Sequence, residues 1–203
     1  HGKTDAFETP LFGRFNVFNC AAAAAAGLGT GMRLSGVREG IRRVTRVPGR
    51  MEFWEHGGIQ VIVDYAHTPD ALENILGAAR EWTRGRLIVL FGCGGDRDRG
   101  KRPEMGRVSA ERADAIVLTS DNPRSERPDA IIREIQAGIP AGVCAEVIED
   151  RKEAIRRALN MARRGDTVVI AGKGHETTQE IGSVRLPFDD REVVKSLLEE
   201  RGM

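Results

Sequence analysis

The chain has 203 residues, with 31 Lys and Arg against 30 Asp and Glu, so its formal net charge is +1. This length fits one domain of ordinary size, or one domain plus a piece of another. With 40% apolar and 30% charged residues, the composition excludes a disordered or collagen-like chain. A net charge so close to zero provides no overall field to attract nucleic acid or an anionic membrane, so we expect neither as a partner.

The cysteine pattern and the hydropathy of the sequence both indicate the cellular compartment of the protein. Cys20, Cys93 and Cys144 are far apart in sequence and form no CxxC pair, which is typical of a reducing compartment. The longest run of small apolar residues, 20–28, is too short to cross a bilayer, and the sequence opens with no secretory leader. These features predict a soluble globular protein of the cytoplasm.

The first 47 residues predict two short helices. Residues 21–26 are all alanine, a strong helix-forming run that we expect to stop at Gly27, Gly29 and Gly31, where φ is unrestricted. A second helix is expected over residues 35–43, with Ser35 as its N-cap. Two helices with so few large apolar side chains make a poor core, so we interpret residues 1–47 as the end of a larger domain.

From residue 48 the pattern changes to alternating strands and helices. A hairpin is expected over residues 51–63, around the turn at Gly57 and Gly58. Short apolar runs then alternate with amphipathic segments, as in parallel strands joined by helices. We expect strands at residues 87–91, 115–118, 145–148 and 167–170, and helices at residues 69–82, 103–112, 128–136, 151–163 and 190–201. The pattern predicts an α/β fold with a Rossmann-like, doubly wound and mostly parallel sheet, preceded by a helical tail.

In a sheet of this kind the ligand lies at the carboxyl ends of the strands, so the residues that follow each apolar run are the candidates for a site. Four of these segments are polar or rich in glycine, at residues 64–70, 92–102, 121–124 and 172–176. We therefore expect one site along this edge of the sheet.

The segment at residues 92–102 is rich in both glycine and charge. Its glycines at 92, 94 and 95 resemble the start of a dinucleotide fingerprint, but Arg97 stands where the third glycine would be, which argues against a nicotinamide cofactor. The segment predicts an anion-binding cradle of backbone N–H groups and basic side chains, although a solvated glycine-rich turn is an alternative interpretation. The basic residues of the cradle would be Arg97, Arg99, Lys101 and Arg102.

Acidic and basic side chains meet in the two remaining segments. Arg124 carries the planar guanidinium that suits bidentate binding of a carboxylate, while Asp121 can hold an ammonium group. Residues 172–176 add a backbone nest and the carboxylate of Glu176. Both charges at one edge indicate a zwitterionic ligand. The alternative interpretation is that residues 121–123 simply close a strand with an Asx-type turn.

Other chemistries find less support in the sequence. The four histidines lack the spacing typical of a transition-metal site, and there is no GxSxG motif for a serine nucleophile, so no metal site is predicted. The triplet Gly2-Lys3-Thr4 matches the end of a P-loop, but Pro10 follows six residues later, where a P-loop should continue into its helix.

Taken together, the motifs resemble the Mur ligases of peptidoglycan synthesis. The resemblance covers nearly the whole chain in the order of the family, at residues 13–26, 48–52, 64–69, 92–103, 121–124 and 171–176. It implies a three-domain ATP-dependent ligase. In that scheme residues 1–47 end the central ATP-binding domain, and residues 48–203 form the C-terminal domain that binds the amino-acid substrate.

Within the family, the motifs are most similar to those of members that add meso-2,6-diaminopimelate to UDP-N-acetylmuramoyl-L-alanyl-D-glutamate. The resemblance implies that ATP, with Mg²⁺ held mainly by the central domain, phosphorylates a carboxylate of the peptide, and that the amine of diaminopimelate attacks the acyl phosphate. It implies a monomeric cytoplasmic enzyme with small-molecule substrates. The chain alone is expected to be inactive, because the family places its P-loop and catalytic residues upstream.

The resemblance also assigns roles to individual positions. The diaminopimelate-binding positions would be Arg97, Asp121, Asn122, Pro123, Arg124, Gly172 and Glu176, and the ATP-binding positions would be Asn19, Arg50, Asp64 and His67. Arg124 implies meso-diaminopimelate, because lysine-adding relatives lack this arginine and a lysine side chain offers it no carboxylate. Two alternatives stay open: a stand-alone amino-acid-binding module, and a related ligase that uses lysine or glutamate.

Overall fold

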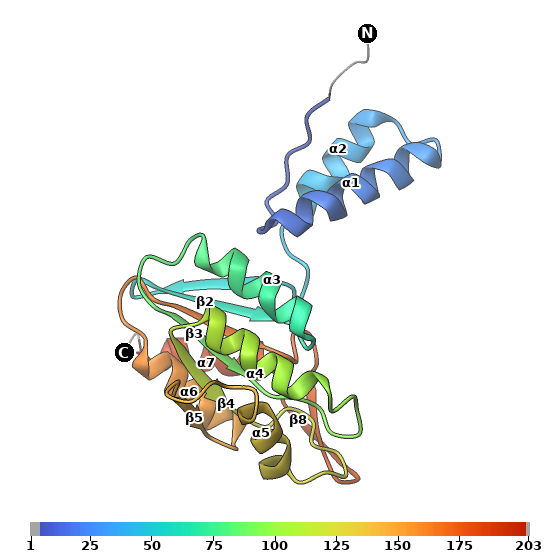
Figure 1. The fold of residues 1–203 in the computed structure, drawn as a ribbon. Coiled ribbons are helices and arrows are strands. Elements are labelled where there is room, and N and C mark those ends of the chain that lie inside the picture. The colour runs from blue at the N-terminus through green and yellow to red at the C-terminus, as the bar shows by residue number, and fades with distance from the viewer. Residues whose placement is uncertain (1–4, 202–203) are drawn as a thin grey trace. The chain divides into compact units, whose positions relative to one another are not determined.

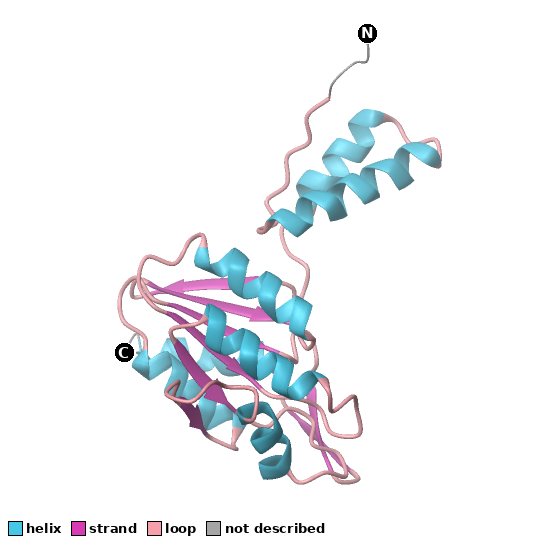
Figure 2. Ribbon diagram, in the orientation of Figure 1, coloured by secondary structure: helices cyan, strands magenta, loops and turns pink. Residues whose placement is uncertain are grey.

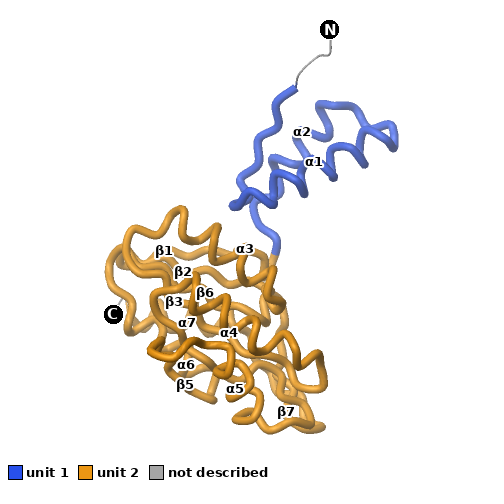
Figure 3. The backbone as a smooth tube through the Cα atoms, viewed as in Figure 1, with its two compact units in different colours: residues 1–47 blue, residues 48–203 orange. Residues whose placement is uncertain are grey.

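The structure is a computed structural model, and it describes residues 5–201 of the chain. The backbone divides into two units, His1–Val47 and Pro48–Met203 (Figure 3). Gly2-Lys3-Thr4, which matched the end of a P-loop, lies outside the described residues. Each helix within residues 5–201 is too short or too polar to cross a membrane.

The first unit contains two packed helices, α1 (Arg14–Gly29) and α2 (Leu34–Arg43). Its small core consists of Ala24, Val37 and Ile41, with two further side chains packed against it. The expected stop among Gly27, Gly29 and Gly31 is confirmed at Gly29, where α1 ends, although the helix continues through Gly27. A Cβ there would lie 3.0 Å from Val37, so the glycine allows α2 to pack closely rather than ending the helix. The expected N-cap is wrong, since Ser35 lies inside α2.

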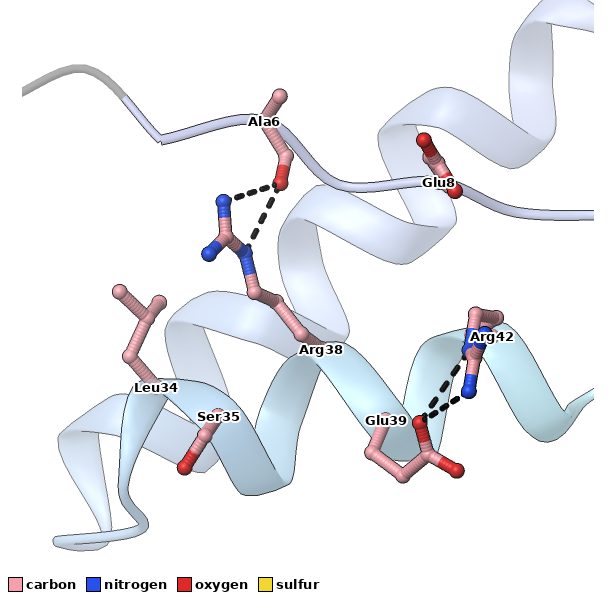
Figure 4. Close-up of a pocket in the computed structure, with 7 residues that line it drawn as sticks. All are labelled: Ala6, Glu8, Leu34, Ser35, Arg38, Glu39 and Arg42. Atoms are coloured by element: carbon pink, nitrogen blue, oxygen red, sulfur yellow. Dashed lines mark hydrogen bonds and ion pairs between the residues drawn. The ribbon is translucent and has the colours of Figure 1, made fainter.

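A groove of about 530 Å³ separates the segment at residues 6–8 from α2 (Figure 4). Arg38 reaches across to this segment and donates from Nε and Nη2 to the carbonyl oxygen of Ala6, at 3.0 and 2.8 Å. Arg42 pairs with Glu39 at 2.9 Å. Since both guanidinium groups already bind partners within this unit, and the lining includes none of the expected site residues, we assign the groove no ligand.

The second unit is built on a six-stranded sheet (Figure 2). Its strands are β1 (Glu52–His56), β2 (Ile59–Asp64), β3 (Leu87–Phe91), β4 (Ala115–Leu118), β5 (Ala145–Val147) and β6 (Thr167–Ala171). They lie in the order β1-β2-β6-β3-β4-β5, and only the β1–β2 hairpin pairs antiparallel. The predicted mostly parallel sheet with an N-terminal hairpin is therefore confirmed.

Helices cover both faces of this sheet (Figure 1). One face carries α3 (Pro69–Arg80), α4 (Lys101–Arg112) and α5 (Pro128–Gln136), and the other carries α6 (Arg151–Met161) and α7 (Asp190–Arg201). Successive side chains of a strand point to opposite faces, so a strand covered on both sides is apolar throughout. β3 is the clearest case, because all five of its residues are buried.

One element was not predicted from the sequence. A second hairpin, β7 (Thr178–Ile181) and β8 (Val184–Pro187), follows β6. All four residues of β8 are exposed, so the segment lacks the alternation of polar and apolar residues that identifies a strand. A signal was nevertheless present, because Gly182 and Ser183 form a two-residue turn of the hairpin type and Gly182 has a φ of +59°.

Candidate functional site

The four segments singled out in the sequence follow β2, β6, β3 and β4, which are neighbours in the sheet. Their carboxyl ends therefore meet along one edge. After β2 and β3 the chain leads to α3 and α4 on one face, whereas after β6 it leads to α7 on the other. This divergence at β6 is the topological switch point at which open α/β sheets bind ligands.

A buried polar network joins the segments after β4 and β6. Lys173 is fully buried, and its Nζ donates to Asn122 Oδ1 at 2.8 Å and to Glu176 Oε2 at 3.3 Å. Nζ also lies 3.5 Å from Asp121 Oδ1. Asn122 Nδ2 donates to the same Glu176 oxygen at 2.8 Å. A buried ammonium group is tolerable only with such partners, so the network holds both segments in register.

Lys173 is the residue that sequence reasoning missed. It lies between two glycines of the segment at residues 172–176, which was noted for its backbone nest and for Glu176. Nothing in the local sequence distinguishes a buried lysine from an exposed one, because its partners Asp121 and Asn122 are some fifty positions earlier. The glycine on each side and the carboxylate three residues later were the only available hints.

The backbone of Gly172 lies close to the side chain of Asp121. Its N–H donates to the carbonyl oxygen of Asp64 at 3.1 Å, and its φ is +116°, a conformation that favours glycine. A Cβ at this position would lie 2.6 Å from Asp121 Oδ2. Any larger residue would therefore displace the Asp121 carboxylate from the network.

Arg124 is fixed in both its backbone and its side chain. Its φ of +52° is unusual for a residue with a side chain. Nε lies 2.9 Å from Glu180 Oε2, and Nη1 donates to the carbonyl oxygen of Gly95 at 2.8 Å. The turn that carries it is anchored by Gln179, whose Nε2 donates to the carbonyl oxygen of Asp121 at 2.8 Å. The structure thus presents one oriented guanidinium at this edge.

Pro123 belongs to the same turn and is buried. A Cβ on Gly95 would lie 1.8 Å from the carbonyl oxygen of Pro123, so a glycine is needed for the loop after β3 to approach the turn after β4. Gly95 N–H also donates to the carbonyl oxygen of Asn122 at 2.9 Å. These contacts bring two of the predicted segments together.

The predicted anion cradle after β3 is wrong for Arg102, and Arg99 and Lys101 already contact other groups of the protein. Arg102 is fully buried and pairs with Glu126 at 2.8 Å and with Glu134 at 2.7 Å. Arg99 pairs with the same Glu134, and Lys101 Nζ donates to a backbone carbonyl oxygen at 2.7 Å. Arg99 and Arg102 fasten this segment to α5 and the turn before it, which supply their carboxylate partners, and Lys101 fastens it to His67 in the loop after β2.

Arg97 lies in the same segment and, like Arg99, is accessible to solvent. Its side chain is exposed, and Nη1 donates to the carbonyl oxygen of its neighbour Asp96 at 2.9 Å. Asp96 in turn has a φ of +53°, and its carboxylate accepts bonds from Ser125 Oγ at 2.6 Å and from Ser125 N–H at 3.2 Å. The loop that carries Arg97 is therefore tied to the residue after Arg124.

The ion-pair cluster around Arg102 should make stability depend on acidity. Hydrogen bonds from the Arg102 side chain, then from the Asp96 N–H, lower the pKa of Glu126 from 4.5 to about 2. A depressed carboxyl pKa stabilises the fold above the unfolded pKa and ceases to do so once the carboxyl is protonated in both states. We therefore expect the free energy of unfolding to fall between pH 4.5 and about 2. In Glu126→Gln this pH dependence should be weaker, as measured by urea unfolding across that range.

Glu199→Gln is the matched control, because Glu199 is an exposed glutamate of α7. It should retain the wild-type pH dependence. Equal slopes for Glu126→Gln and wild type would contradict the assignment.

A second group of expected site residues lies at the end of β2. Both carboxylate oxygens of Asp64 accept backbone N–H groups, from Met51 and from Ala66, each at 2.8 Å. Burial raises the pKa of Asp64, while these two bonds and the charge of Arg50 oppose that shift. Asp64 thus ties the start of β1 to the loop after β2.

Arg50 and His67 flank one aromatic ring. The guanidinium carbon of Arg50 lies 4.5 Å from the centre of the Tyr65 ring, a cation–π distance. The rings of His67 and His175 lie 4.5 and 5.0 Å from the same ring, centre to centre. A Cβ on Gly174 would lie 2.6 Å from the Tyr65 Cβ, so this group packs tightly against the segment after β6.

Asn19, the remaining expected ATP contact, lies on α1 in the first unit. Its Nδ2 donates to Asn16 Oδ1 at 3.0 Å. Within residues 5–201 no group of three or more His, Cys, Asp or Glu side chains is arranged to hold a metal ion.

The fold defines an α/β domain of the Rossmann-like class, in which ligands bind at the carboxyl edge of the sheet. The chain belongs to the Mur ligase family: the family description "Mur ligase, glutamate ligase domain" matches residues 49–174.

Individual relatives extend the match to nearly the whole chain. The UDP-N-acetylmuramoyl-L-alanyl-D-glutamate--2,6-diaminopimelate ligase of Gloeobacter violaceus is 53% identical over 198 residues, which are 97% of this chain and 40% of that protein. The enzyme of the same name from Geobacillus thermodenitrificans is 51% identical over 203 residues, which are 99% of this chain and 41% of that protein. The chain therefore spans about 40% of the length of these curated relatives.

Solved structures agree with this membership. A UDP-N-acetylmuramoyl-L-alanyl-D-glutamate--2,6-diaminopimelate ligase superposes with a TM-score of 0.76 at 43% identity, covering 98% of this chain and 41% of the other. A UDP-N-acetylmuramate-alanine ligase from Thermotoga maritima, at 20% identity, has a TM-score of 0.64 and covers 97% of this chain and 40% of its own. The second match reflects the fold alone.

Proposed function

We propose that this chain is the C-terminal part of an ATP-dependent ligase that adds meso-2,6-diaminopimelate to UDP-N-acetylmuramoyl-L-alanyl-D-glutamate in peptidoglycan synthesis. Relatives with that name at 53% and 51% identity support the proposal. The observation that carries it is the oriented guanidinium of Arg124 at the same sheet edge as the carboxylates of Asp121 and Glu176.

The amino-acid substrate is zwitterionic at both ends, and the site offers both signs of charge. Arg124 would bind the distal carboxylate through charge-assisted hydrogen bonds, which are stronger and more directional than neutral ones. Glu176 and Asp121 would hold an ammonium group. The remaining contacts to diaminopimelate are proposed for Arg97, Asn122, Pro123 and Gly172. Lysine lacks the second carboxylate, so Arg124 would select against it.

The proposed reaction proceeds through covalent activation of the peptide carboxylate. Phosphoryl transfer from ATP converts this carboxylate into an acyl phosphate, and the amine of diaminopimelate then attacks the carbonyl carbon. The new C–N bond forms, the C–O bond to phosphate breaks, and the amine loses a proton. The residues of this chain bind and orient the amine, which brings the reacting atoms together.

We propose that Asn19, Arg50 and His67 contact ATP, with Mg²⁺ held mainly by the central domain of the ligase. Arg50 suits this role because it is the basic member of the group around Tyr65. Both carboxylate oxygens of Asp64 accept backbone N–H groups. We therefore propose that Asp64 supports the ATP site by holding the backbone around Arg50 and His67 in place.

We also propose that residues 1–47 end the central ATP-binding domain and that residues 48–203 are the C-terminal domain of a monomeric cytoplasmic enzyme. The first unit has a small core and leaves Phe18 75% exposed and Val17 61% exposed. Large apolar side chains left on a surface mark a contact, here with the rest of the domain in the longer protein.

The test of this function is amide formation by the complete ligase. With ATP, Mg²⁺, UDP-N-acetylmuramoyl-L-alanyl-D-glutamate and diaminopimelate, we expect the tripeptide product by mass spectrometry, with lysine used at least about 100-fold less efficiently. The 203-residue chain alone is the control and should release no phosphate. Preference for lysine would indicate a related ligase, and binding without product would indicate a stand-alone binding module.

A further inference from the structure

We infer that Glu180 of the β7–β8 hairpin is a positioning residue that aims the guanidinium of Arg124 and thereby sets the preference for a substrate with a second carboxylate. This inference rests on the proposed function. Glu180 is outside the motifs that carry the family resemblance.

The side-chain geometry assigns a definite orientation to Arg124. Glu180 Oε2 lies 2.9 Å from Arg124 Nε, and both side chains are less than a quarter exposed. The Gly95 carbonyl oxygen accepts from Nη1 at 2.8 Å. An arginine has five N–H donors in a rigid fork. With Nε held by Glu180 and Nη1 held by the carbonyl oxygens of Gly95 and, at 3.5 Å, of Asn122, the fork is locked, and Nη2 is the donor group proposed for a ligand carboxylate.

The same hairpin also holds the backbone of Arg124. Arg124 N–H donates to the carbonyl oxygen of Glu180 at 3.0 Å, and Gly182 N–H donates to the carbonyl oxygen of Arg124 at 2.8 Å. These bonds form a parallel bridge between Arg124 and Ile181. Because backbone and side chain are fixed by one element, little freedom remains to be lost when a ligand binds, and preorganisation of this kind increases affinity.

The charges around Glu180 leave Arg124 attractive to an anion. Glu180 also pairs with Arg185, and its hydrogen bond from Arg185 is the main reason that the pKa of Glu180 is lowered. Two guanidinium groups thus share one carboxylate, so the three side chains keep a net charge of +1. A carboxylate that paired with Arg124 alone would cancel its charge instead. The three side chains line one groove of about 460 Å³.

The experiment compares Glu180→Ala with wild type in the complete ligase, with diaminopimelate and lysine as alternative substrates. We expect the KM for diaminopimelate to rise about 10-fold while kcat changes less than about 2-fold. The efficiency with lysine should stay unchanged, so the preference for diaminopimelate falls about 10-fold. Glu180→Gln keeps a hydrogen-bond acceptor but loses the charge, so its KM for diaminopimelate should lie between those of wild type and Glu180→Ala.

Glu111→Ala is the matched control, because Glu111 is a half-exposed glutamate of α4 that also pairs with an arginine, Arg107, at 2.8 Å, and it lies outside the groove. Its KM for diaminopimelate should stay within about 2-fold of wild type. An unchanged KM and preference in Glu180→Ala would overturn the inference, and so would an equal loss of efficiency with both substrates, which indicates a merely structural role. Failure of the wild-type ligase to use diaminopimelate would overturn the proposed function itself, and it would be seen before any variant is compared.

Discussion

Arg124→Ala in the complete ligase is expected to raise the KM for diaminopimelate about 100-fold, which corresponds to about 2.7 kcal/mol. The guanidinium is the group proposed to bind the distal carboxylate, and a hydrogen bond between charged partners contributes about 1.5–3 kcal/mol. The effect should exceed that of Glu180→Ala, because the donor itself is removed rather than misaligned. Steady-state kinetics with varied diaminopimelate measures it.

Arg127→Ala is the matched control for this prediction. Arg127 is three residues further along the chain, is well exposed and pairs with Asp129 at 2.9 Å. Its KM should stay within about 2-fold of wild type. If Arg124→Ala used diaminopimelate with an unchanged KM, the carboxylate-binding role of Arg124 would be wrong, even if the enzyme remained a diaminopimelate ligase.

Arg151→Met is expected to lower the free energy of unfolding by about 3–5 kcal/mol. Arg151 and Asp190 are both fully buried, and Nε and Nη2 donate to the two carboxylate oxygens at 2.8 and 2.7 Å. Burial opposes the charged form of Arg151, but the charge and hydrogen bonds of Asp190 outweigh it and raise the pKa. Removing the arginine leaves a buried carboxylate without its counter-ion.

Urea unfolding of the 203-residue chain measures this loss. Arg157→Met is the control on the same helix, because Arg157 is half-exposed and its ion pair with Glu146 should contribute less than about 1 kcal/mol. The double variant of Arg151→Met with Asp190→Leu should be less destabilised than the sum of the two single variants. A loss below about 1 kcal/mol in Arg151→Met would show that the pair adds little to stability.

Arg151 also contacts the backbone directly before two residues of the candidate site. Its Nη2 donates to the carbonyl oxygen of Ala171 at 3.0 Å, directly before Gly172, and its Nη1 lies 3.4 Å from the carbonyl oxygen of Ser120, directly before Asp121. One buried guanidinium thus fastens the ends of β4 and β6 beneath the proposed substrate contacts. The sequence placed this arginine at the start of a helix and offered no reason to single it out.

Local sequence patterns were sufficient to predict the strands of the sheet and the edge of the sheet at which the candidate site lies. The strands at Leu87–Phe91 and Ala115–Leu118 have the predicted bounds, because runs of apolar residues bounded by polar turns have one stable place, between two layers of helices. Parallel strands bring their carboxyl ends together whatever the loops contain. The order of segments along the chain therefore predicted that Asp121, Arg124 and Glu176 would share one edge of the sheet.

Only the tertiary structure decided which charges serve the site and which hold the fold. Arg102 and Lys173 are both fully buried, and Arg97 is exposed, although all three belong to similar segments rich in glycine and charge. The difference depends on partners far along the chain, such as Glu126, 24 positions from Arg102, and Asn122, 51 positions from Lys173. A charge can be buried only where such partners converge on it, and their convergence is a property of the folded chain that no local pattern encodes.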